Sequence, residues 1–133
     1  AAILRYVEEL ARRYDATVIL TQVVESMPPR LELGIPDWAL QKEYRRRTRL
    51  AEFYLAGLQG ELYEKGIQSR TCVVSGSVVD AIIQAAEREG ADLIAMASHG
   101  RTGLSQVFYG SVAAGVLNRI DRPLLLIRSR GHD

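Results

Sequence analysis

The sequence predicts an α/β protein with three layers (α/β/α), in which an open parallel sheet is covered by helices on both faces. Three observations support this prediction. Segments with helical periodicity alternate with short apolar runs along most of the 133 residues. These runs are nearly continuous in apolar residues, which is typical of parallel strands that are buried on both faces. A glycine-rich turn follows the third run, at the position where open α/β sheets bind their ligands.

The first part of the chain predicts a helix, a strand and a loop. Apolar residues recur at helical spacing over residues 3–13, with charged residues on the opposite side. The β-branched run from Thr17 to Val24 predicts a buried strand. The segment from Glu25 to Pro36 contains three prolines, which exclude a regular helix or strand, so we expect a surface loop.

A long helix is predicted next, with Asp37 as its cap and a stop at Gly66. Its expected buried face is traced by seven apolar residues, which are Trp38, Leu40, Tyr44, Ala51, Leu55, Leu58 and Leu62. The helix also carries a basic cluster, which consists of Arg45, Arg46, Arg47 and Arg49. Helical spacing spreads this cluster around the outer face beside acidic residues, so we interpret it as a solvated surface rather than a nucleic-acid site.

The second half of the chain predicts three more strands joined by helices. A strand over residues 67–74 leads to a helix that Ser77 is expected to cap and that ends at Gly90. A third strand is predicted over residues 92–97. The last strand runs from Pro123 to Arg128, with proline at the first position, where a missing N–H is tolerated.

The glycine-rich turn after residues 92–97 has the features of an anion-binding loop. Ser98 is expected to leave the sheet at the carboxyl end of the strand, and Gly100 allows backbone N–H groups to approach a ligand without a Cβ in the way. Gly110 and Ser111 follow, and Ser111 can cap a helix whose positive dipole end faces the same ligand. The turn therefore predicts a phosphate site. Tight turns in a domain that binds nothing are the alternative, because glycine loops alone are weak indicators.

Composition limits the domain count and the range of partners. With 47% hydrophobic residues, a chain of this length can form one core, and we expect a single domain over residues 1–133. Charges of both signs are interspersed and the formal net charge is +1, which disfavours nucleic acid and anionic membranes as partners. No apolar run approaches the roughly 20 residues that span a bilayer. The single cysteine cannot form an internal disulfide, so we expect a cytoplasmic protein.

At the glycine-rich turn the chain resembles the universal stress protein family. Nucleotide-binding members of that family carry the motif Gly-x2-Gly-x9-Gly-(Ser/Thr). The matching positions in this chain are Ala97, Gly100, Gly110 and Ser111. Ala97 departs from the motif, because glycine stands there in the family and the extra methyl group would narrow the phosphate loop. The resemblance covers nearly the whole chain, and its sharp motif lies between Met96 and Val112.

The resemblance implies an adenine nucleotide site that binds ATP, with Mg²⁺ as a candidate companion. Its implied nucleotide-binding residues are Val23, Met96, Ala97, His99, Gly100, Arg101, Gly110, Ser111 and Val112. Val23 and Met96 would pack against the base, and the backbone around Gly110 would hold the phosphates. His99 and Arg101 have two interpretations, as groups beside the phosphates or as loop residues that face solvent.

The resemblance also implies an adenine nucleotide alpha hydrolase-like, Rossmann-like fold with the strand order 3-2-1-4-5. Four strands can be read from this chain, and the first strand of the family is not visible among them. In the family that strand lies between those that correspond here to residues 17–24 and 92–97. We therefore predict that residues forming this strand precede Ala1 in the whole protein, or that another chain supplies the strand.

Two functions follow from these observations, and a third is disfavoured. The first is a stress-response regulator or switch that binds ATP. The second is an interaction module of the same family that binds no nucleotide and acts as a dimer. Family members commonly dimerise through the last strand, so a homodimer through Leu124 to Ile127 is expected in both cases. The third is an enzyme, but no Walker-type sequence or carboxylate pair accompanies the loop, so at most slow ATP hydrolysis or autophosphorylation is expected.

Overall fold

Helices and strands alternate along the chain in the predicted order. The structure is a computed structural model that describes residues 2–25, 34–99 and 111–129. Its elements are α1 (Ala2–Tyr14), β1 (Val18–Val24), α2 (Asp37–Glu64), β2 (Ser69–Ser75), α3 (Val78–Glu89), β3 (Ile94–His99), α4 (Ser111–Arg119) and β4 (Leu124–Ser129). Most of the loop predicted between β1 and α2, and most of the glycine-rich turn, lie outside the described residues.

The strands form two parallel pairs. β1 pairs with β2, with Val18 opposite Ser69, and β3 pairs with β4, with Ile94 opposite Leu124. Within the described ranges, no strand joins one pair to the other. In the family order 3-2-1-4-5, strand 1 is the one missing here. β1 and β2 then correspond to strands 2 and 3, and β3 and β4 correspond to strands 4 and 5. The fold is therefore the predicted Rossmann-like α/β arrangement, with its sheet divided at the position of that strand.

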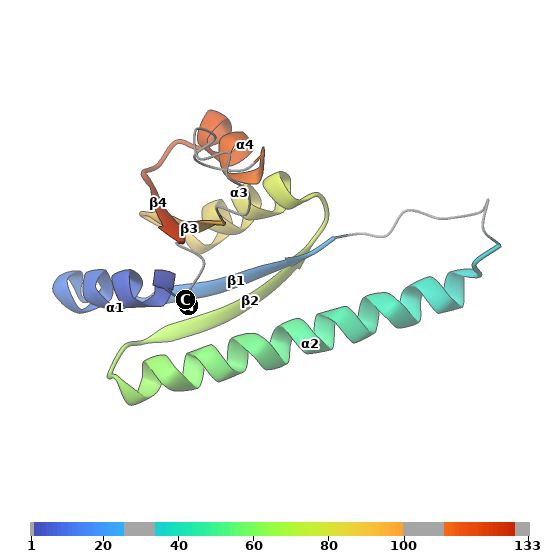
Figure 1. Cartoon of the computed structure of the whole chain (residues 1–133), viewed down its shortest axis with the longest axis horizontal. Helices are drawn as coiled ribbons and strands as arrows, with labels where there is room; N and C mark the ends of the chain where they lie inside the picture. The colour runs from blue at the N-terminus through green and yellow to red at the C-terminus, as the bar shows by residue number, and fades with distance from the viewer. Residues whose placement is uncertain (1, 26–33, 100–110, 130–133) are drawn as a thin grey trace.

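Helices cover both faces of the β1–β2 pair. Figure 1 shows α2 along one side of these strands and α3 on the other side, and both helices contact both strands. The main core cluster lies between β1 and α2 and is made of Ala11, Leu20, Leu55, Leu62 and Ile67. Leu62 is fully buried. Because Ala11 belongs to α1, the first helix is tied into the same core while it also contacts β3 and β4.

The last helix, α4, packs closely on α3. A Cβ atom added at Gly115 would lie 2.8 Å from Val79 Cγ2, so the glycine allows the two helices to approach one another. Val116, the next residue, is fully buried. At the helix ends, the Arg119 guanidinium donates a hydrogen bond to the Asp80 carboxylate, and Ser77 Oγ donates to Asp80 Oδ2 at 2.7 Å. The exposed ion pair therefore connects the last turn of α4 to the first turn of α3.

This connection predicts a dependence of stability on pH. The hydrogen bonds from Ser77 and Arg119 lower the pKa of Asp80 from its ordinary value. A lowered pKa stabilises the folded state above the pKa of the unfolded chain, about 3.9, and this contribution is lost as the pH falls through the folded-state value. We expect the free energy of unfolding to fall more steeply below about pH 4 in the parent than in Asp80→Asn. Urea denaturation at several pH values measures both slopes.

The control for this measurement is Glu87→Gln, which removes another exposed carboxylate from α3. The free energy of unfolding of this variant should change with pH as that of the parent does. If Asp80→Asn and the parent lose stability in parallel as the pH falls, the Asp80 carboxylate does not contribute to folding.

Two predicted helix caps are wrong in detail. Pro36, not Asp37, is the N-cap residue of α2. Its carbonyl oxygen accepts hydrogen bonds from the N–H groups of Ala39 and Leu40. Asp37 is the first helical residue, where its charge still faces the positive end of the helix dipole. Ser77 does stand at the cap position of α3, but its hydroxyl group donates to Asp80 and makes no side-chain cap bond.

Two expectations about which residues face the core or leave the sheet are also wrong. Trp38 is 67% exposed, because it lies about a third of a turn around α2 from the buried Leu62. Ser98 stays in the sheet, opposite Arg128, because β4 continues far enough to pair with β3 through His99. The basic cluster of α2 is exposed, as expected.

Candidate functional site

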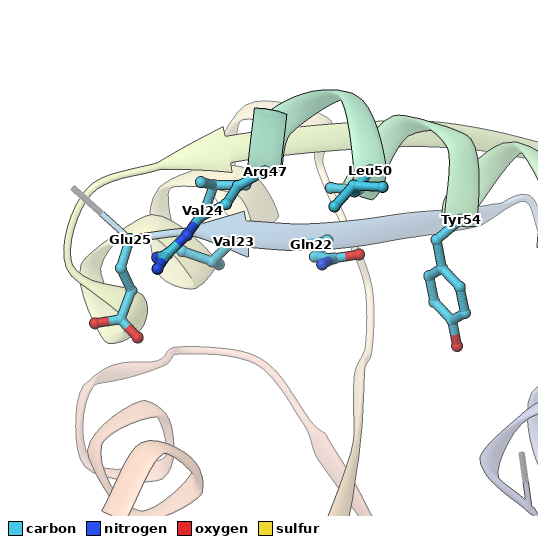
Figure 2. A pocket seen from close by; sticks show the side chains of 8 residues that line it. Gln22, Val23, Val24, Glu25, Arg47, Leu50 and Tyr54 are labelled. Atoms are coloured by element: carbon cyan, nitrogen blue, oxygen red, sulfur yellow. The ribbon is translucent and has the colours of Figure 1, made fainter. Parts of the chain in front are cut away.

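A pocket lies between the carboxyl end of β1 and the middle of α2 (Figure 2). Its volume is about 430 Å³, within the range of roughly 300–1,000 Å³ that is typical of small-molecule sites. The lining residues are Gln22, Val23, Val24, Glu25, Arg47, Leu50, Ala51 and Tyr54. The first four come from β1 and its end, and the last four come from α2.

Local sequence explains why the pocket forms here. Val24 and Ala51 are buried at the contact between β1 and α2, and the small side chain of Ala51 leaves room beside the strand. Leu50 and Tyr54 are more than half exposed, and Figure 2 shows both projecting from the same side of α2. The pocket therefore has a buried floor and an open side, and its lining combines apolar side chains with the polar groups of Gln22, Glu25 and Arg47.

Glu25 and Arg47 bring one charge of each sign to the pocket, and Arg47 is held by a carboxylate one turn earlier on α2. Arg47 Nε donates to Glu43 Oε1 at 3.3 Å, and Arg46 donates to the same carboxylate through Nη2 at 2.6 Å and Nε at 3.0 Å. The hydrogen bond from Arg46 is the main cause that lowers the pKa of Glu43 to about 2. Glu43 is therefore ionised at neutral pH. Within the described residues Glu43 is the acceptor that binds Arg47, and the remaining guanidinium N–H groups of Arg47 can meet an anion.

The structure places the predicted site residues in two separate regions. Val23 lines the pocket. Met96 and Ala97 lie on β3, and Ser111 and Val112 form the start of α4, and none of these four lines that pocket. The separation follows from the divided sheet, because β1 and β3 belong to different strand pairs.

The remaining predicted residues belong to the glycine-rich turn. The backbone of His99 ends β3. Gly100, Arg101 and Gly110 lie outside the described residues, and Ser111 is the first residue of α4. A helix that begins at this position directs its first N–H groups back toward the end of the turn.

Sequence reasoning missed the part of the pocket that comes from α2. Leu50 and Tyr54 are four residues apart and lie outside the predicted apolar face of the helix. That spacing places both on one side of a helix, so an apolar pair away from the core was a visible sign of a second contact surface. Arg47 was interpreted only as part of a solvated cluster, and it is both exposed and at the pocket.

Two further features are absent from the described ranges, a membrane-spanning helix and a cluster of metal ligands. None of their helices combines the length and the apolar composition needed to cross a membrane. The same residues contain no group of three or more His, Cys, Asp or Glu side chains arranged to hold a metal ion.

Comparison with known proteins gives consistent matches. The family model described as "Universal stress protein family" matches residues 1–128. Universal stress protein MJ0531 of Methanocaldococcus jannaschii is 30% identical over 122 residues, which cover 90% of this chain and 69% of that protein. Universal stress protein MJ0577 of the same organism is 31% identical over 83 residues, which cover 62% of this chain and about half (51%) of that protein.

Solved structures extend the likeness along nearly the whole chain. The structure of MJ0577 superposes with a TM-score of 0.79 at 26% identity and covers 97% of this chain and 87% of that chain. A universal stress protein family protein from Arabidopsis thaliana, solved with AMP bound, has a TM-score of 0.61 at 21% identity and covers 99% of this chain and 78% of that chain. At this identity the second likeness is one of fold alone.

Proposed function

Because the chain belongs to the universal stress protein family, we propose that it binds an adenine nucleotide, in the first place ATP, and acts as a stress-response regulator or switch. The observation that carries the proposal is the helix start at Ser111, which directly follows the glycine motif. Free N–H groups and the positive dipole end make such a start a site for phosphate groups. The AMP complex of the relative from Arabidopsis thaliana supports an adenine nucleotide as the ligand class.

On this proposal the ligand spans both regions of the site. The phosphates bind the backbone around Gly100 and Gly110 and the hydroxyl group of Ser111, while the base packs against Val23 and Met96. Arg47 offers a cation at the pocket beside Val23, where an anionic ligand gains a charge-assisted hydrogen bond. Mg²⁺ accompanies ATP as part of the same proposal, held by the phosphates and water rather than by a protein cage.

The alternative is an interaction module of the same family that binds no nucleotide. β4 pairs with β3 along one edge, and in the described ranges no strand pairs with its other edge. Such an edge is a template for a second copy, so we propose a homodimer through Leu124 to Ile127 under either function. We also propose that the protein acts in the cytoplasm and that any hydrolysis of ATP is slow.

The test is to identify and then to titrate the ligand. Purified protein is denatured, and the released small molecules are separated by chromatography against ATP, ADP and AMP standards. We expect about one adenine nucleotide per chain, or, if the protein is purified empty, saturable heat on titration with magnesium ATP. Magnesium GTP serves as the control for base recognition. An empty eluate together with no heat from any adenine nucleotide would overturn the proposal and favour the interaction module.

A further inference from the structure

The outer face of α2 carries an apolar stripe that is not used by the core. We define the α2 stripe as Leu50, Phe53, Tyr54 and Gly57. Their spacing of i, i+3, i+4 and i+7 places them along one side of the helix, as in helices that pack against a second helix. Phe53 is 83% exposed, and Leu50 and Tyr54 are more than half exposed. Figure 1 shows that α2 forms one border of the molecule.

The described part of the chain gives no packing reason for the glycines within this helix. Gly57 and Gly60 lie in the interior of α2, where glycine weakens a helix relative to alanine. A Cβ atom added at either position would meet nothing within 4 Å. No neighbour in the described structure therefore requires glycine at these sites. A second helix that crosses at Gly57 would require it, because the absent side chain lets the two backbones approach.

The charges of α2 are divided between its two halves. Residues 37–50 carry five basic residues against two acidic ones, which are Lys42, Arg45, Arg46, Arg47 and Arg49 against Asp37 and Glu43. Residues 51–64 carry only acidic charges, at Glu52, Glu61 and Glu64. Two such helices attract one another when they run antiparallel and repel one another when they run parallel.

We propose that two copies of this chain associate through antiparallel pairing of their α2 helices along the α2 stripe. A two-fold axis between Phe53 and Tyr54 gives a self-complementary contact. Leu50 then faces Gly57 of the partner subunit, since these positions lie at equal distances from the axis. Arg46 and Glu61 are also equidistant from it, so Arg46 faces Glu61 of the partner subunit. The aromatic rings at the centre are removed from water.

This surface is separate from the proposed dimer contact at β4 and from the proposed nucleotide loop, but two of its residues, Leu50 and Tyr54, also line the pocket beside β1. Phe53, Arg46 and Glu61 do not line the pocket beside β1. Variants at Phe53 and Glu61 should therefore bind adenine nucleotide as the parent does. The inference does not depend on nucleotide binding, and its failure would leave the proposed function intact.

The first test measures self-association of Phe53→Glu by sedimentation equilibrium over a range of concentrations. We expect the dissociation constant of the pair to rise at least about tenfold, because the variant loses a buried ring from both helices and adds two acidic charges at the axis. Tyr63→Glu is the matched control, since Tyr63 is also an exposed aromatic residue on α2 but lies off the stripe. A parent that is monomeric throughout, or that associates equally well with Phe53→Glu, overturns the proposal. The second result would direct attention to β4.

The second test establishes the antiparallel direction by charge reversal. Arg46→Glu and Glu61→Arg should each weaken self-association about tenfold, because each variant brings like charges together at both ends of the pair. An equal mixture of the two variants should associate like the parent, since every contact is again between opposite charges. Arg45→Glu mixed with Glu61→Arg is the control that should not recover. A mixture that associates no better than its components would refute the antiparallel pairing.

Discussion

Replacing Leu62 with alanine should lower the free energy of unfolding by about 2–5 kcal/mol. The Leu62 side chain is fully buried and packs in the cluster that joins α2 to β1 and α1. Truncation removes apolar contacts and leaves a cavity that neighbours from three different elements cannot all move to fill. Urea denaturation followed by far-ultraviolet circular dichroism measures the change.

The control is the next residue along the helix. Tyr63 is 81% exposed, so Tyr63→Ala should change stability by no more than about 0.5 kcal/mol. A loss below about 1 kcal/mol for Leu62→Ala would mean that the site collapses around the smaller side chain or that Leu62 is not in the core.

Replacing Gly110 with aspartate should weaken adenine nucleotide binding at least about a hundredfold, a change of roughly 3 kcal/mol. Gly110 directly precedes Ser111, the first residue of α4, where the phosphates are proposed to bind. A carboxylate there competes with the phosphates for the helix N-terminus and repels them. Isothermal titration with magnesium ATP measures the loss.

The matched variant is Gly110→Asn, which has nearly the same shape without the charge and which tolerates left-handed turn conformations better than most residues. It should retain most of the affinity lost in Gly110→Asp. Thermal melting of both variants checks that the fold survives. If Gly110→Asp binds as tightly as the parent, the phosphates do not bind at the start of α4, and the pocket beside β1 becomes the site to examine.

The alternation of elements was predictable because it depends on local patterns. β1 was expected over residues 17–24 and runs from Val18 to Val24, since a β-branched run specifies a strand by itself. The details at helix ends were not predictable. The hydroxyl group of Ser77 bonds to Asp80, which is also bound by Arg119 of α4. These hydrogen bonds form only where α3 and α4 meet, so the local sequence around Ser77 does not predict them.

The residues of the candidate site were also predictable only in part. Val23 was singled out through the family resemblance and lies in the pocket. Leu50 and Tyr54 of α2 were missed, because the direction in which an exposed apolar pair points depends on how the helix lies across β1. The motif residues at Gly100 and Gly110 lie outside the described residues, so their role in binding stays a prediction.

The division of the sheet has a consequence for the cooperativity of unfolding. Within the described residues, β1 is hydrogen-bonded to β2 and β3 is hydrogen-bonded to β4, but no sheet hydrogen bond joins one pair to the other. Coupling between the two pairs passes through two helices instead. α3 contacts β1, β2 and α4, while α1 joins the cluster at β1 and also contacts β3 and β4. Among the described residues, side-chain packing on α1 and α3 therefore links the two halves. The strand expected between β1 and β3 would add sheet hydrogen bonds to this link.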